Sequence, residues 1–103
     1  MVIFERYPHV NDLLKHYISS LNREDVGKMV NEGIKSEEQA ELFCRFIWKM
    51  VEAINEDEEN GVAVLGSADN TEMLPDISYE VTRLMKSSGF YSVWENVSKS
   101  EMS

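Results

Sequence analysis

The chain contains a single cysteine, Cys44, and this scarcity excludes several kinds of protein. One thiol cannot form an internal disulfide framework or a cysteine-only metal cluster. No apolar run approaches the roughly 18 to 20 residues that span a bilayer, so we expect no membrane segment. The first residues also lack the basic start and the long apolar centre of a signal peptide. Together these absences favour a cytoplasmic protein.

Motifs for catalysis and ligand binding are also missing. The chain has no HExxH, GxxxxGK[ST], GxGxxG or nucleophile-elbow pattern. Residues 56–61 match the start of a calcium loop, but Ser67 occupies its twelfth position, where a bidentate glutamate is required. His9 and His16 are not spaced as the i, i+4 pair of a zinc protease. We therefore expect no enzyme activity, no metal site and no cofactor.

Basic residues are few, because ten Lys and Arg stand against 19 Asp and Glu, giving a formal net charge of −9. Nucleic acids are bound by clustered basic residues, so direct nucleic-acid binding is disfavoured. The whole acidic excess lies between residues 50 and 82, where Lys and Arg are absent and nine acids occur: Glu52, Glu56, Asp57, Glu58, Glu59, Asp69, Glu72, Asp76 and Glu80. Such a segment keeps a protein soluble, and it can also speed association with a basic partner.

The clearest structural pattern lies in residues 36–54, where apolar side chains recur with helical spacing. Ser36 and Gln39 have the spacing of a capping box, which predicts the start of a helix. The apolar arc is too broad for a helix lying on a surface, so neighbours should cover it from several sides. Cys44 lies on this arc and is expected to be a small core residue. The arc comprises Ala40, Phe43, Cys44, Ile47, Met50, Val51 and Ile54, widened by Leu42, Phe46 and Ala53.

Two helices are predicted before this central one. Residues 8–21 show apolar spacing of three, four and seven, and Pro8 suits a first helical turn. Asn22 should end that helix and cap the next, which runs to Gly33. Because the links are very short, the three helices should pack as neighbours.

Two helices are also predicted in the last third of the chain. One should begin near Asp76 and end at Gly89, and a short last helix should follow over residues 90–97. The sequence thus predicts an all-α fold, a compact bundle of four main helices plus a short C-terminal helix. This bundle should form one domain over residues 1–103.

Two stretches between these helices are read as non-helical. Residues 55–61 form an acidic, polar stretch that ends in glycine, which is typical of a loop. Residues 62–65 are β-branched and apolar between two glycines, which fits either a short strand or a buried loop.

Trp48 and Tyr79 are the aromatic residues most relevant to binding. Trp48 falls at the edge of the polar strip of the central helix, next to Glu52 and Arg45. A tryptophan at such a boundary is either a lid over the core or an interface anchor. Tyr79 lies among the acids of the fourth helix and offers a second anchor.

Residues 22–90 contain Ser36-Glu37-Glu38 at the start of a long helix, Met50 and Glu52 further along it, the acidic stretch after it, Pro75, Ile77, Val81 and Ser88-Gly89-Phe90. With these features the stretch resembles the small acidic helical immunity proteins that neutralise bacterial nuclease toxins. The tyrosine pair followed by proline in the binding helix of that family is absent, and residues 62–66 stand in its place. The resemblance implies a helical inhibitor that binds a nuclease domain.

The charge distribution and the resemblance lead to one functional hypothesis. We expect a non-catalytic acidic binding protein, an immunity-type inhibitor that covers the basic substrate cleft of a toxin nuclease. The alternatives are a structural or regulatory helical module, as a monomer or a homodimer, and an acidic nucleic-acid mimic. The partner-binding residues expected for the inhibitor are the nine acids of residues 50–82 together with Trp48 and Tyr79.

Overall fold

The central helix, α3 (Glu37–Glu59), dominates the computed structural model, which describes residues 4–62 and 70–102. Its start is capped as predicted, because the Gln39 backbone N–H donates to Ser36 Oγ at 3.1 Å. The Gln39 side chain accepts from the Lys35 backbone N–H at 2.8 Å, one residue earlier than in a standard capping box. Leu42 is 38% exposed, so the predicted arc was too wide there. The buried residues of α3 are Ala40, Phe43, Cys44, Phe46, Ile47, Met50 and Ile54.

The predicted acidic loop is wrong, because residues 55–59 are the last turns of α3. Glutamate is a good helix former, and the buried Ile54 holds this part of the helix against the core. The helix ends in a Schellman motif, in which the Val62 N–H donates to the Asp57 carbonyl at 2.8 Å and the Gly61 N–H to the Glu58 carbonyl at 3.1 Å. Gly61 has a φ of 73°, which favours glycine.

The two helices before α3 are α1 (His9–Ser20) and α2 (Glu24–Glu32). Asn22 ends α1 as predicted, with a φ of 54°, and the Arg23 N–H donates to the Ile18 carbonyl at 2.9 Å. Asn22 does not cap α2, however. Its left-handed conformation closes the first helix, and Arg23 precedes α2 without a side-chain cap.

The C-terminal part contains a 3₁₀ helix, η1 (Asn70–Met73), followed by α4 (Leu74–Ser88) and α5 (Tyr91–Met102). The fourth helix starts slightly earlier than predicted because Pro75 is accommodated in its first turn. Gly89 ends it with a φ of 84°, as predicted. Among the described residues all regular elements are helices, which confirms the all-α fold. Val62 is in no strand, and residues 63–65 lie outside the described part.

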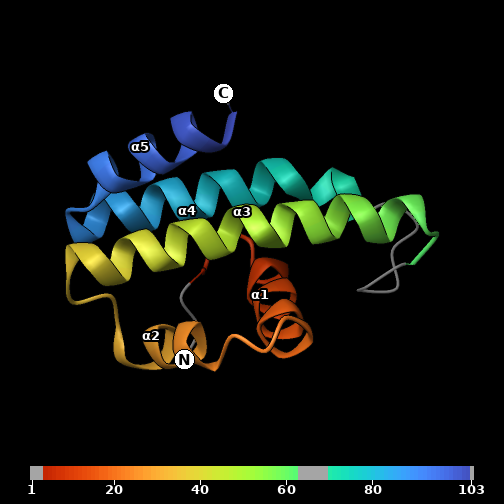
Figure 1. The fold of residues 1–103 in the computed structure, drawn as a ribbon, viewed down its shortest axis with the longest axis horizontal. Helices are drawn as coiled ribbons and strands as arrows, with labels where there is room; N and C mark the ends of the chain where they lie inside the picture. Colours follow the sequence, from red (N-terminus) through yellow and green to blue (C-terminus); the bar gives the residue numbers. More distant parts are fainter. Residues whose placement is uncertain (1–3, 63–69, 103) are drawn as a thin grey trace.

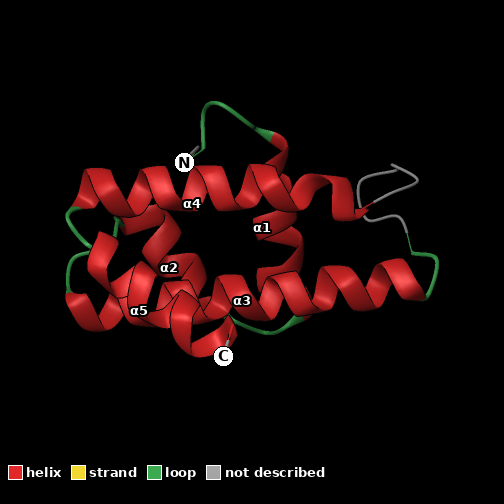
Figure 2. Cartoon of the chain, turned by 90° about the horizontal axis from the view of Figure 1, so that it is seen from above, coloured by secondary structure: helices red, strands yellow, loops and turns green. Residues whose placement is uncertain are grey.

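The helices form three levels (Figure 1). The middle level contains α3 and α4, which run in opposite directions along the long axis of the molecule. The pair α1 and α2 lies on one side of α3, and α5 lies on the other side. Figure 2 shows α5 from above, next to α3. The apolar arc of α3 is therefore covered from several sides, as its width predicts.

Residues 4–8 form an N-terminal arm that is held by α1 and α4. Phe4 is only 2% exposed, and its N–H donates to Asn11 Oδ1 at 3.2 Å while its carbonyl accepts from Asn11 Nδ2 at 2.7 Å. The Tyr7 N–H donates to Glu80 Oε2 on α4 at 3.3 Å. The arm thus gives two buried polar side chains their hydrogen-bond partners.

Cys44 is a core residue, as its place on the apolar arc predicts. The side chain is fully buried, and Sγ lies 3.6 Å from Met85 Sδ of α4. Burial raises the pKa of the thiol to about 12, so the reactive thiolate is scarce at neutral pH.

Candidate acidic binding surface

The opposite directions of α3 and α4 bring the two halves of the acidic segment to one end of the molecule. The C-terminal end of α3 and the 3₁₀ helix η1 lie together at the right in Figures 1 and 2. The last turns of α3 carry Glu56, Asp57, Glu58 and Glu59, and η1 carries Glu72. Residues far apart in the sequence therefore concentrate negative charge at this end.

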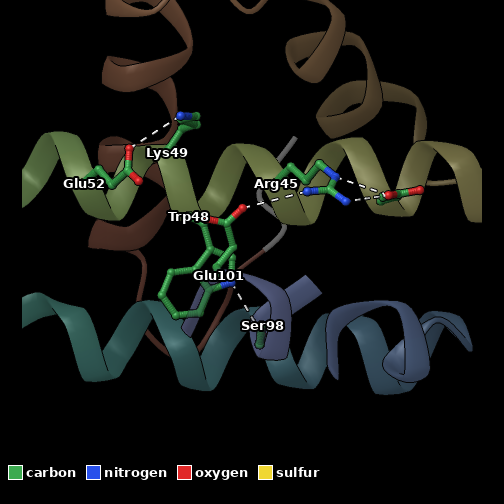
Figure 3. Close-up of polar contacts among 7 residues, drawn as sticks. Arg45, Trp48, Lys49, Glu52, Ser98 and Glu101 are labelled. Atoms are coloured by element: carbon green, nitrogen blue, oxygen red, sulfur yellow. Dashed lines mark hydrogen bonds and ion pairs between the residues drawn. The ribbon is translucent and has the colours of Figure 1, made fainter. Parts of the chain in front are cut away.

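Of the eight predicted acids that the structure describes, four are exposed to solvent, and we call them the acidic surface: Glu52, Glu56, Glu59 and Glu72. The three on α3 are spaced i, i+4 and i+7, so they project from one face of the helix. Glu52 lies 3.6 Å from Lys49 Nζ, and its side chain is 63% exposed (Figure 3). An ion pair this exposed contributes little stability and leaves the carboxylate accessible.

The acids at the end of α3 occupy an electrostatically unfavourable position. The C-terminus of a helix carries a partial negative charge from its unpaired carbonyls. The last turn of α3 contains no basic residue to offset it. The acids at the start of α4 differ, because Asp76 lies in a first turn, where a negative charge is favourable. The helix dipole thus favours the charge of Asp76 but not that of Glu56 or Glu59.

Three other predicted binding acids are engaged inside the chain. Asp57 is half-buried and accepts a hydrogen bond from the Tyr17 hydroxyl at 2.6 Å. Asp76 Oδ2 lies 2.7 Å from His9 Nε2. Glu80 is only 2% exposed, and its carboxylate also lies 3.7 Å from the Arg83 guanidinium. These contacts connect α1, α3, α4 and the N-terminal arm.

The two predicted acids not yet placed are Glu58 and Asp69. Glu58 is half-buried and already engaged within the chain. Asp69 lies outside the described residues.

The Tyr17–Asp57 hydrogen bond should be measurable as stability. Tyr17→Phe keeps the buried ring but removes the donor to a carboxylate, so the free energy of unfolding should fall by about 1.5–3 kcal/mol. Urea unfolding followed by circular dichroism at neutral pH would measure this change. An unchanged midpoint would show that the bond contributes nothing.

The same pair predicts a pH dependence. Burial, and then the hydrogen bond and charge of Asp57, raise the pKa of Tyr17. Its stabilising contribution is therefore complete below the ordinary tyrosine pKa of about 10 and is lost as pH rises beyond that value. Tyr17→Phe has no hydroxyl to ionise, so its stability does not fall in this way. The difference in the free energy of unfolding between the wild type and Tyr17→Phe should therefore narrow above about pH 10. A gap that stays constant would contradict the assignment.

Trp48 packs inside the chain. Its ring stacks on Trp94 of α5, with centroids 6.1 Å apart and planes 23° apart. Its Nε1 donates to Ser98 Oγ at 3.4 Å (Figure 3). Arg45, one turn earlier, reaches Glu101 of α5 at 3.8 Å. This geometry matches the first of the two predicted alternatives, a lid over the core, and not an interface anchor that faces outward.

Tyr79, the other predicted anchor, is accessible. Its side chain is 47% exposed, and the Tyr7 ring contacts it edge-on at 5.6 Å. The Arg6 guanidinium lies 5.9 Å from the centre of the Tyr79 ring. Tyr79 therefore belongs to the surface formed by α4 and the N-terminal arm.

A groove of about 310 Å³ borders the acidic surface. Leu21 and Ala53 supply its apolar part, and Leu21 is 37% exposed. Glu52 and Glu56 lie along it together with the cations Arg23 and Lys49. The groove offers apolar contact next to carboxylates, which suits the stem and head of a long basic side chain.

Sequence patterns could not identify Tyr17, His9 and Tyr7 as partners of the acids. Each is 40 or more residues from its acid in the sequence, as in the pair Tyr17 and Asp57. The sequence offered one signal for Tyr17. Its place on the apolar face of a helix predicts burial, and the hydroxyl of a buried tyrosine usually finds a hydrogen-bond partner.

The described residues also bear on metal binding and on membrane insertion. In the described part of the chain, no three His, Cys, Asp or Glu side chains are grouped so that they could hold a metal ion. Across residues 4–62 and 70–102, no helix is both long and apolar enough to cross a membrane. Comparisons with protein-family models, with curated proteins and with solved structures find no match to this chain.

Proposed function

We propose that this chain is a non-catalytic acidic binding protein of the immunity type, which inhibits a nuclease by covering its basic substrate cleft. The observation that carries the proposal is the exposed acidic run at the C-terminal end of α3, where negative charge is unfavourable for the helix. Charge that lowers stability and yet is concentrated at one site suits a binding role. A nuclease cleft is positively charged because it holds phosphates, so the two surfaces are complementary.

The binding set we propose is smaller than the sequence suggested. It comprises Glu52, Glu56, Glu59 and Glu72, with the groove around Leu21 as the adjacent apolar contact. We leave Trp48, Asp57, Asp76 and Glu80 out, because their side chains are engaged in packing or in contacts within the chain.

An inhibition assay tests the proposal directly. The immobilised chain would capture proteins from its source cell at low salt, and the captured proteins would be released at high salt. Any basic protein recovered would then be assayed for cleavage of nucleic acid with and without the purified chain. Stoichiometric loss of cleavage is expected. The proposal fails if the partners recovered are acidic or if their nuclease activity is unaffected.

The effect of the negative charge at the end of α3 on the free energy of unfolding can be measured on the isolated protein. Glu59→Gln removes a negative charge from the last turn of α3, so the free energy of unfolding should rise by about 0.3–1 kcal/mol. Glu38→Gln is the matched control, because Glu38 lies exposed in the first turn of the same helix and its loss should destabilise. Urea unfolding at low salt would measure both. If Glu59→Gln destabilises, the acidic run is structural.

A further inference from the structure

The outer face of α4 has a chemistry that contrasts with the acidic surface. A groove of about 670 Å³ runs along it, and its lining residues follow one face of the helix. We call it the α4 groove, lined by Ser78, Tyr79, Thr82, Arg83, Lys86 and Ser87. Among the residues that the structure describes, no carboxylate lines it, although acids outnumber bases in the chain.

The polar groups of the α4 groove are suited to an anion. Arg83 and Lys86 can only donate hydrogen bonds, and the Arg83 side chain is 56% exposed even though it lies 3.7 Å from buried Glu80. Thr82 Oγ1 accepts the Trp94 indole N–H at 3.0 Å, so its own hydroxyl hydrogen is available for another acceptor. Two cations and this hydroxyl therefore belong to residues that line the same groove.

Exposed tyrosines flank the same face. Tyr79 is 47% exposed and Tyr91 is 39% exposed. Arg6 lies over the Tyr79 ring at 5.9 Å, and Lys86 lies over the Tyr91 ring at 5.1 Å. Tyrosine and arginine are enriched among the residues that dominate protein–protein binding energy.

We propose that the α4 groove binds an acidic peptide segment of a partner protein. Carboxylates would pair with Arg83 and Lys86, and the peptide chain would lie against the tyrosines. Single-stranded nucleic acid fits less well, because base stacking needs open aromatic faces and here cations cover them. This site is distinct from the acidic surface, so it can be tested independently.

Titration of the whole chain with a fluorescently labelled oligo-glutamate peptide tests the proposal. Arg83→Gln/Lys86→Gln should weaken binding about tenfold, because two exposed charge pairs are lost. The matched control is Lys28→Gln/Lys35→Gln, which removes the same charge from exposed positions outside the groove and should change binding less than about twofold. Lys86→Glu is a second variant, since Lys86 lies over the Tyr91 ring and its reversal keeps Arg83, the ion-pair partner of Glu80, in place.

Four results would overturn the proposal. The first is that oligo-glutamate does not bind the intact chain, and the second is that both double variants weaken binding equally. The third is that an oligothymidylate binds more tightly than the peptide, which would assign the groove to nucleic acid. A salt-sensitive dimer seen by sedimentation and abolished by Lys86→Glu would assign it to a second copy, and would also overturn it.

Discussion

Replacement of Trp94 by alanine should lower the free energy of unfolding by about 3–5 kcal/mol, the usual loss for a large aromatic residue in a core. Trp94 is 8% exposed and joins three helices, because its ring stacks on Trp48 of α3 and its Nε1 donates to Thr82 of α4. The alanine variant would lose the packing of the indole ring and leave a cavity. The Thr82 hydroxyl would also lose the N–H group that donates to it. A fall in the melting temperature of about 12 °C or more should follow.

Thermal and urea unfolding, followed by far-ultraviolet circular dichroism, would measure this effect. Tyr91→Ala is the matched control, because Tyr91 lies in the same helix but is 39% exposed, and its loss should change stability by only about 0.5 kcal/mol. If the two variants are equally stable, α5 does not dock through Trp94 as described.

Charge reversal at the acidic surface should slow association with the basic partner that we propose by about 10- to 100-fold at low salt. The variant is Glu56→Lys/Glu59→Lys, which alters two exposed residues on one face of α3. The dissociation rate should change less, because exposed charges act mainly on the rate at which the two proteins meet. Stopped-flow measurements over a range of salt concentrations would separate the two rates.

The matched control for charge reversal is Glu32→Lys/Glu38→Lys. Both residues are exposed, and they lie toward the other end of the molecule, at the end of α2 and the start of α3. This variant changes the net charge by the same amount, so an equal slowing in both would show that only total charge matters. Equal rates for the wild type and Glu56→Lys/Glu59→Lys would exclude the acidic surface from binding.

The helices were predictable because their signals are local. Apolar spacing, the Ser36 cap and the terminators Asn22 and Gly89 each act within a few residues. The error at residues 55–59 arose because acidic composition was read as a loop, whereas glutamate favours helix and the true stop is at Gly61.

The candidate site was predictable only in part. Composition showed which acids are in excess, but it could not show which are exposed. Burial of Glu80 depends on the N-terminal arm folding back over α4, and engagement of Asp57 depends on α1 crossing α3. Both are long-range contacts that no local pattern encodes, so the sequence could not separate the four exposed acids from the four that are at least partly buried.

The helical form of the acidic run has a consequence for affinity. A flexible loop loses conformational entropy when a partner fixes it, and that loss weakens binding. Here the last turn of α3 is already fixed at its end by Gly61 and on its side by Tyr17. The backbone that carries the exposed carboxylates is thus preorganised, so a cationic partner of the kind we propose would meet little loss of backbone entropy on binding.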